Sequence, residues 1–381
     1  MAIHLQLLVR TGRQVWAALI DDSLSSVRLD RRRLGEPAEG LATSPGCNDV
    51  VAGCVVIFNI LQVKDRQSCI TFSGTFVCVL AKSSGVIVCF LIAGAACGQD
   101  LVPRAYLVTP IRSNAVILSY SWNDGQIYFD PSVPIDDARG RFSTYILSYY
   151  HSFGMLGRSA NIVLSAPYVK GELEGTVAGS RAQVLPSGTA DARIRISVNL
   201  YGGRAMKVSD FRKWREKRLI GASVTVIVPS GQYDQARVIN LGTNRWAFKP
   251  ELGITRRWDR WVAEGYFGTW LYSGNPAFFP GISNRTQSLM FAFEGHIGYY
   301  VRPGLWASFD GNFWAGGHSS INGIAKKDSQ RESRVGTTIS IPVSRHQSVK
   351  VSYSRGAYRQ IGGNFQTLSA GWQYSWIGRS R

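Results

Sequence analysis

The chain has 381 residues, of which 45% are hydrophobic and 12% aromatic, and its formal net charge is +18. After residue 100 no uninterrupted apolar run of about eighteen residues or more occurs, which excludes membrane-spanning helices from that part of the chain. If residues beyond 100 cross a membrane, they must cross it as strands of a closed barrel.

Residues 79–98 have the three-part plan of a secretory signal peptide. Lys82 precedes an apolar stretch at residues 86–93, and small residues follow it. Cleavage after Gly98 satisfies the preference for small residues at the cleavage site, as does cleavage after Ala95. The sequence therefore predicts an exported protein.

Residues 1–78, which precede this signal, show no sustained helical or strand periodicity. We predict that they form an unstructured N-terminal extension. Because a signal peptide belongs at an N-terminus, we interpret Met1 as a misassigned start and expect translation to begin near Val79 or Leu80.

Cysteine is confined to the first part of the chain. All six cysteines lie between Cys47 and Cys97, and residues 99–381 contain none. A chain that crosses an oxidising compartment before it folds avoids stray disulfides in this way. This distribution favours export of residues 99–381.

Residues 190–203 read ADARIRISVNLYGG and alternate between apolar and polar side chains. Successive side chains of a strand point to opposite faces, so Ile194 and Ile196 share one face while Arg193 and Arg195 share the other. Such a strand fits an antiparallel sandwich with its apolar face on a core, and it also fits a membrane barrel with its apolar face on lipid. The rest of the chain must distinguish the two.

Twelve segments after Pro110 show this alternation. They are residues 113–122, 142–153, 159–169, 190–202, 218–228, 245–256, 260–271, 286–300, 304–315, 332–343, 347–355 and 365–376. The connections alternate between mostly brief ones, such as residues 257–259, and long ones, such as residues 170–189. Short periplasmic turns and long external loops are typical of outer-membrane barrels, and an even number of strands leaves both termini in the periplasm.

We therefore expect an all-β fold, a closed antiparallel transmembrane β-barrel over residues 99–381.

The longest of the otherwise brief connections contains VSDFRKWREK, at residues 208–217. Its apolar spacing fits a helical turn or two at the membrane interface, and a surface loop is the alternative. The last strand carries LSAGWQYSW and ends at Trp376, which resembles the C-terminal insertion signal of outer-membrane proteins. This resemblance implies the barrel-assembly machinery as a partner. The insertion signal ends on its aromatic residue, whereas in this chain residues 377–381 follow Trp376.

Three stretches resemble a known family: DFRKWREK from Asp210, VPSGQYD from Val228 and NLGTNRWAFKPELG from Asn240. They are similar to the outer-membrane transporter family of the MetA pathway of phenol degradation. The resemblance covers about residues 100–376 and implies a transporter barrel in the outer membrane of a Gram-negative bacterium. One departure is Arg204, where a proline is expected. The family implies no catalytic or binding residues.

Ionisable residues on the polar face are the candidates for a functional lumen. They are Arg193, Arg195, Lys249, Glu251, Glu264, Glu294, His296, Asp310, Arg334 and Lys350. Opposed charges of this kind screen solutes by charge and size. Alternatively, the same groups pair with one another and merely fill a narrow barrel. No motif implies a metal or a cofactor.

The function that we predict is a channel passing small solutes passively, including hydrophobic or aromatic compounds. The loop YSGNPAFFPGISN, with Phe278, Phe279 and Pro280, either folds inward as a plug or rests on lipid headgroups. The excess positive charge suits anionic solutes, outer-membrane lipid and the phosphates of lipopolysaccharide. Lys326, Lys327 and Arg331 are the loop candidates for the last of these. For an exported barrel we expect no nucleic-acid partner.

An outer-membrane lipid hydrolase is the rival class, because some barrels of this size carry a Ser-His pair on one strand. Position 298, two residues after His296, is glycine, so that pattern fails. Ser308 on the next strand is another nucleophile that could approach His296. We expect no catalytic residues.

Overall fold

The computed structural model describes residues 101–128, 135–177, 179–237, 239–279, 281–360 and 362–378. The predicted N-terminal extension and signal peptide, residues 1–98, lie outside these ranges. Strands make up most of the described residues, which also include one short helix, α4 (Val208–Lys213).

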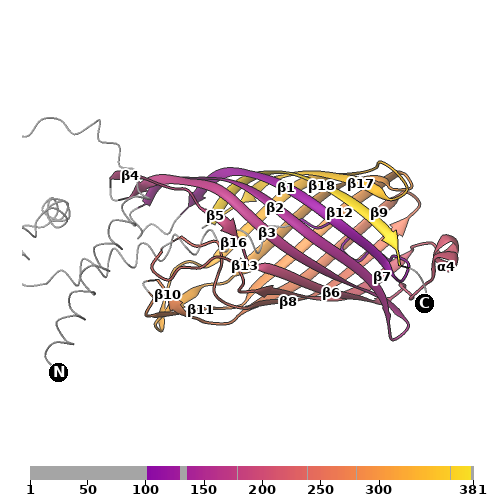
Figure 1. The fold of residues 1–381 in the computed structure, drawn as a ribbon, viewed down its shortest axis with the longest axis horizontal. Coiled ribbons are helices and arrows are strands. Elements are labelled where there is room, and N and C mark those ends of the chain that lie inside the picture. The colour runs from indigo at the N-terminus through magenta and orange to yellow at the C-terminus, as the bar shows by residue number, and fades with distance from the viewer. Residues whose placement is uncertain are drawn as a thin grey trace, which may run out of the picture. The chain divides into compact units, whose positions relative to one another are not determined.

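Twelve long antiparallel strands close into a barrel (Figure 1). In chain order they are β1 (Ser113–Tyr128), β2 (Ile135–Met155), β3 (Arg158–Val177), β6 (Ala192–Tyr201), β7 (Arg218–Val228), β8 (Ala247–Trp258), β9 (Trp261–Tyr272), β12 (Met290–Arg302), β13 (Leu305–Gly316), β16 (Gln330–Pro342), β17 (Gln347–Tyr358) and β18 (Gly362–Ile377). Each strand pairs with the next in this order, and β1 pairs with β18 to close the ring. A closed ring leaves no unpaired edge in lipid.

The prediction of a twelve-stranded barrel is confirmed, and each predicted segment overlaps one barrel strand. Several strands run further than the sequence indicates. β1 continues to Tyr128 rather than ending at residue 122, and β2 and β3 have 21 and 20 residues. Outside the hydrocarbon both faces of a strand lie in water, so the ladder continues there without alternation of apolar and polar residues.

The two faces of the barrel wall are inverted relative to those of a soluble protein. On β13, Phe309 points outward and is 60% exposed, whereas the adjacent Asp310 points inward and is 0% exposed. The outward side chains of β7 and β12 are likewise exposed and apolar, as at Val224 and Phe293. A continuous apolar outer surface of this kind is expected where the wall faces hydrocarbon.

The two ends of the barrel differ, and we name them the turn end and the loop end. At the turn end the connections are mostly short, and Ser113 at the start of β1 lies opposite Ile377 at the end of β18. At the loop end, two short strands pair with β3 and four others form a separate sheet, the loop sheet. The short strands are β4 (Ser180–Val184) and β5 (Ser187–Thr189), and the loop sheet consists of β10 (Asn275–Phe278), β11 (Ser283–Gln287), β14 (Ser319–Ile321) and β15 (Ile324–Ala325).

The loop YSGNPAFFPGISN contributes β10 and β11 to the loop sheet. Phe278 is buried there, and Phe279 and Ile321 pack against it. Because Phe278 forms the small apolar core of the loop sheet, it does not rest on lipid headgroups. Pro280 lies outside the described residues.

α4 lies at the turn end (Figure 1), so the helical alternative for residues 208–217 is the one observed. Phe211 and the adjacent Trp214 stack on each other and pack against a buried cluster of Val108, Met206 and Leu219. The two aromatic rings therefore cover the apolar cluster at the turn end. Among the described residues, no helix is long and apolar enough to span a membrane.

Replacing Phe309 by arginine tests whether the wall faces lipid. We expect Phe309→Arg to lower the free energy of unfolding by about 2–4 kcal/mol, because it places a charge in hydrocarbon. Denaturant unfolding of the barrel in lipid vesicles measures this change. Ile324→Arg is the matched control, since Ile324 is also exposed but belongs to the loop sheet, and it should change stability by less than about 0.5 kcal/mol. Equal effects at both positions would contradict a lipid-facing wall.

Candidate functional site: the barrel lumen

The lumen is occupied by the segment that precedes β1, residues 101–110, which we call the N-terminal strap. It enters from the turn end, where β1 begins, and its Tyr106 and Val108 are 1% and 0% exposed. Side chains on the inner faces of β7, β8, β9 and β12 bind it. Sequence analysis did not find the strap, because a short stretch without alternation is indistinguishable from a linker.

Arg104 anchors the strap through two carboxylates. Its Nη1 donates to Oε1 of Glu264 at 3.1 Å, its Nη2 donates to Oε2 of Glu216 at 2.5 Å, and all three residues are buried. Burial alone would lower the pKa of Arg104, but the charges of Glu264 and Glu216 outweigh burial and raise that pKa above its ordinary value. The φ of Arg104 is 67°, in the left-handed region that residues other than glycine rarely adopt. The ion pairs therefore hold the strap in one specific conformation.

Tyr106 sits on two glycines of the lumen wall. Gly221 on β7 lies opposite Gly253 on β8, and a Cβ added at either position would meet the Tyr106 ring at 2.2 or 2.1 Å. The Tyr106 hydroxyl donates to Oε1 of Glu251 at 3.0 Å and lies 3.1 Å from Oγ of Ser223. The wall therefore makes room for the Tyr106 ring at the two glycines and supplies hydrogen-bond partners for its hydroxyl.

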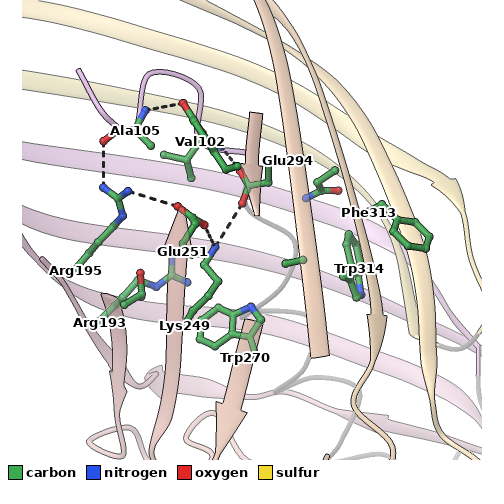
Figure 2. Close-up of a pocket in the computed structure, with 14 residues that line it drawn as sticks. Val102, Ala105, Arg193, Arg195, Lys249, Glu251, Trp270, Glu294, Phe313 and Trp314 are labelled. Atoms are coloured by element: carbon green, nitrogen blue, oxygen red, sulfur yellow. Dashed lines mark hydrogen bonds and ion pairs between the residues drawn. The ribbon is translucent and has the colours of Figure 1, made fainter. Parts of the chain in front are cut away.

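A void of about 60 Å³ remains between the strap and the wall, and charged side chains border it (Figure 2). Nζ of Lys249 lies 2.7 Å from Oε2 of Glu251 and 3.5 Å from Oε1 of Glu294. Arg195 Nη1 donates to the backbone oxygen of Ala105 at 3.1 Å, and Arg195 Nη2 lies 3.6 Å from Oε1 of Glu251. The ion pairs thus connect the wall to the strap and leave room for only a few water molecules.

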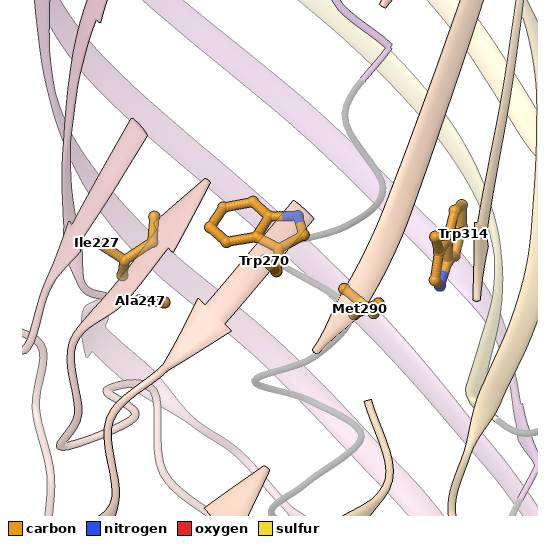
Figure 3. Close-up of a cluster of buried hydrophobic side chains, with 5 residues drawn as sticks. All are labelled: Ile227, Ala247, Trp270, Met290 and Trp314. Atoms are coloured by element: carbon orange, nitrogen blue, oxygen red, sulfur yellow. The ribbon is translucent and has the colours of Figure 1, made fainter. Parts of the chain in front are cut away.

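An apolar layer, which we call the collar, lies on the loop-end side of this void. It consists of Ile227, Ala247, Trp270, Met290 and Trp314 (Figure 3). Nζ of Lys249 lies 5.5 Å from the centre of the Trp270 ring, so the collar adjoins the charged layer directly. Arg245, which precedes Ala247 on the same face, lies on the other side of the collar, with its guanidinium 4.5 Å from the centre of the Tyr272 ring.

His296, Asp310 and Ser308 form a buried network nearer the turn end. His296 Nδ1 lies 2.9 Å from Oδ1 of Asp310, and Ser308 Oγ donates to the same oxygen at 2.8 Å. A serine nucleophile must give its proton to the imidazole. Here Ser308 donates to the carboxylate, so this geometry does not activate it.

The lumen wall formed by β17, β18 and β1 carries small polar side chains. Lys350 faces this part of the lumen, because its Nζ lies 5.6 Å from the centre of the Trp306 ring, which is buried on the inner face of β13. Gly371 lies opposite Lys350 and opposite Ser119, in the same row of the sheet. The Lys350 side chain is nevertheless exposed. This side of the lumen therefore holds open space that the strap does not fill.

The structure places all ten predicted lumen residues on the inner face. Five surround the void, namely Arg193, Arg195, Lys249, Glu251 and Glu294. Glu264 binds the strap, His296 binds Asp310, Arg334 donates to Ser354 and Thr367, and Lys350 stands apart at the open side.

Three residues that organise the lumen were not predicted: Arg104, Tyr106 and Glu216. The one signal in the sequence that could have located a bulky inserted ring is a pair of glycines on the inner face of adjacent strands, Gly221 and Gly253. That signal becomes readable only when the register between β7 and β8 is known.

Comparison with solved structures identifies the fold as that of an outer-membrane β-barrel. The chain is similar to an outer membrane channel from Pseudomonas putida F1, with a TM-score of 0.61 and 17% sequence identity over 73% of this chain and 100% of that one. It matches the transport unit of the autotransporter AIDA-I from Escherichia coli with a TM-score of 0.43 and 9% identity, over 78% of this chain and 98% of that one. No curated protein sequence matches the chain.

Residues 140–376 match the family described as "Putative MetA-pathway of phenol degradation". The chain therefore belongs to this family. The match confirms the resemblance seen in the sequence and covers most of the barrel.

Gly253→Ala should displace Tyr106, because the added methyl group occupies the position of its ring. The reporter is Ala105→Cys in a chain whose six native cysteines are replaced by serine, and the measurement is its rate of reaction with a maleimide. We expect Gly253→Ala to accelerate this reaction. Gly265→Ala is the control, since nothing lies within 4 Å of a Cβ added there. Equal rates in the two variants would show that the contact between Gly253 and Tyr106 does not hold the strap in place.

Proposed function

We propose that the protein is a channel that passes small solutes passively across the outer membrane of a Gram-negative bacterium. The observation that supports this most is how the lumen is filled. Small barrels without a pore are filled by the side chains of their own wall. This barrel instead contains a separate strap, a charged void and an exposed lysine at an open side.

We assign the turn end to the periplasm and the loop end to the cell exterior. Outer-membrane barrels have short periplasmic turns and longer external loops, and the start of β1 and the end of β18 both lie at the turn end. The loop sheet and the collar would then face arriving solutes. Lys327 and Arg331 are exposed and Lys326 is half-buried, so they would lie at the level of lipopolysaccharide phosphates.

The arrangement of the lumen favours small solutes with an apolar or aromatic body. Trp270 and Trp314 in the collar offer ring surfaces. Next to them the void is lined by three cations, Arg193, Arg195 and Lys249, and by two carboxylates, Glu251 and Glu294, so cations are in excess. An aromatic solute with an acidic group would find both features side by side.

The strap makes the observed lumen a closed form of this channel. The Val102 backbone N lies 3.4 Å from Oε2 of Glu294, well inside the barrel. Polar contacts hold Val102, Arg104 and the Tyr106 hydroxyl, and water can replace these contacts when this part of the strap leaves. Val108 packs instead in the apolar cluster at the turn end.

Conductance in planar lipid bilayers tests the channel. We expect Arg104→Ala to conduct several-fold more than the wild type, because loss of this guanidinium removes the cation of Glu264, leaves Glu216 with Arg257 alone and releases the strap. Arg139→Ala is the control, since it breaks an exposed ion pair with Asp124 on strands β1 and β2. It should leave the conductance unchanged. If neither the wild type nor Arg104→Ala conducts, the channel is contradicted.

A lipid hydrolase is a second candidate only because Ser308 and His296 share the Asp310 carboxylate. We expect the purified barrel to leave phospholipid vesicles intact, since Ser308 donates to Asp310 and not to the imidazole of His296. A lipase assay on the wild type and on His296→Ala measures this. Hydrolysis by the wild type that disappears in His296→Ala would reverse the ranking of the two functions.

A further inference from the structure

Two arginines face each other on the outer surface of the barrel at the turn end. Arg218 begins β7 and lies directly opposite Arg256 on β8. Both side chains are exposed and lie on the outward parity of their strands, next to the apolar Ile220 and Ile254. Like charges at directly opposed positions of a sheet repel each other. Among the described residues neither guanidinium has an ion-pair partner.

The arginine pair borders an open depression of about 470 Å³. Its lining contains three further cations, Arg215, Lys217 and Arg257, and two carboxylates, Glu216 and Asp259. Glu216 is buried, and its nearest cation is Arg104 of the strap, whereas its distance to Arg257 Nη1 is 3.8 Å. The outer mouth of the depression therefore keeps a strong excess of positive charge.

Aromatic side chains mark the depth of this depression in the membrane. Trp258 lines it, lies opposite Trp261, and is exposed on the same outer face as Arg256. The ring of Tyr299 contacts that of Trp261 at 4.9 Å between centres. Tryptophan and tyrosine gather where hydrocarbon meets the headgroup region. The arginine pair thus lies at headgroup level, with apolar wall directly beside it.

We propose that this depression binds the headgroup phosphate of an anionic glycerophospholipid, with the acyl chains lying on the adjacent apolar wall. Guanidinium groups bind phosphate oxygens through paired hydrogen bonds, and one phosphate between Arg218 and Arg256 would remove their repulsion. The choice of a glycerophospholipid rests on the proposed orientation, which places the turn end in the periplasmic leaflet. A free phosphate would bind the same charges but would not use the apolar wall beside them.

Titration with dioleoyl phosphatidylglycerol, followed by native mass spectrometry of the detergent-solubilised protein, tests the proposal. We expect the wild type to retain this lipid in preference to dioleoyl phosphatidylcholine. In Arg218→Gln/Arg256→Gln the apparent affinity for phosphatidylglycerol should fall by about tenfold or more, because both charge-assisted contacts are lost. Arg302→Gln/Arg345→Gln removes the same charge from exposed residues elsewhere at the turn end and should retain the wild-type affinity.

Three results would overturn the proposal. The first is equal retention of the two lipids by the wild type, which needs no variant to fold. The second is an equal loss of affinity in both double variants, which would indicate a diffuse charge effect. The third is displacement of the lipid by an equimolar concentration of inorganic phosphate, which would show that the apolar wall adds no affinity and would indicate a site for soluble anions. Conductance of the same preparations is measured separately, so failure of the channel and failure of the lipid site are distinguishable.

Discussion

A strand surrounded by hydrocarbon cannot leave its backbone donors and acceptors unpaired, and the closed ladder of this barrel follows from that constraint. β1 pairs with β18 over its whole length, from Ser113 opposite Ile377 to Tyr128 opposite Gly362. Once the ring is closed, one face of the wall meets lipid and the other encloses a space. The apolar residues must then point outward, and the lumen receives polar and charged side chains. Those side chains tolerate burial only when they are paired.

The strap supplies an ion-pair partner for buried carboxylates that face the lumen. Without Arg104, the carboxylates of Glu264 and Glu216 would lose their closest cation inside the barrel. Removing one partner of a buried ion pair costs about 3–5 kcal/mol, so the strap and the wall stabilise each other. Because the attachment consists of a few localised contacts, their loss exchanges one set of polar partners for water. A packed apolar plug would lack this alternative.

Alternation of period two is repeated along the chain, and for that reason the sequence predicts the twelve strands and the inner position of residues such as Glu251 and His296. Parity does not say which inner residues meet. His296 contacts Asp310 because β12 and β13 pair in one register, and the loop sheet joins Arg285 to Ile321 across a long separation in sequence. The strap is further from prediction, since its place depends on glycines from two strands and carboxylates from others. Sequence pattern therefore determines the wall, whereas register determines the site.

The chain between β6 and β7, together with the start of β7, has residues that face the lumen and residues that face the outer surface. Glu216 points inward to Arg104, and Arg218, two residues later, points outward beside the basic depression. Arg257 also lines this depression, and its guanidinium lies 3.8 Å from Glu216 and 4.3 Å from the centre of the Tyr300 ring. Glu216 therefore has two cations within ion-pair distance, Arg104 from the strap and Arg257 from the wall. The carboxylate on which the strap depends is thus shared with a residue that also lines the outer depression.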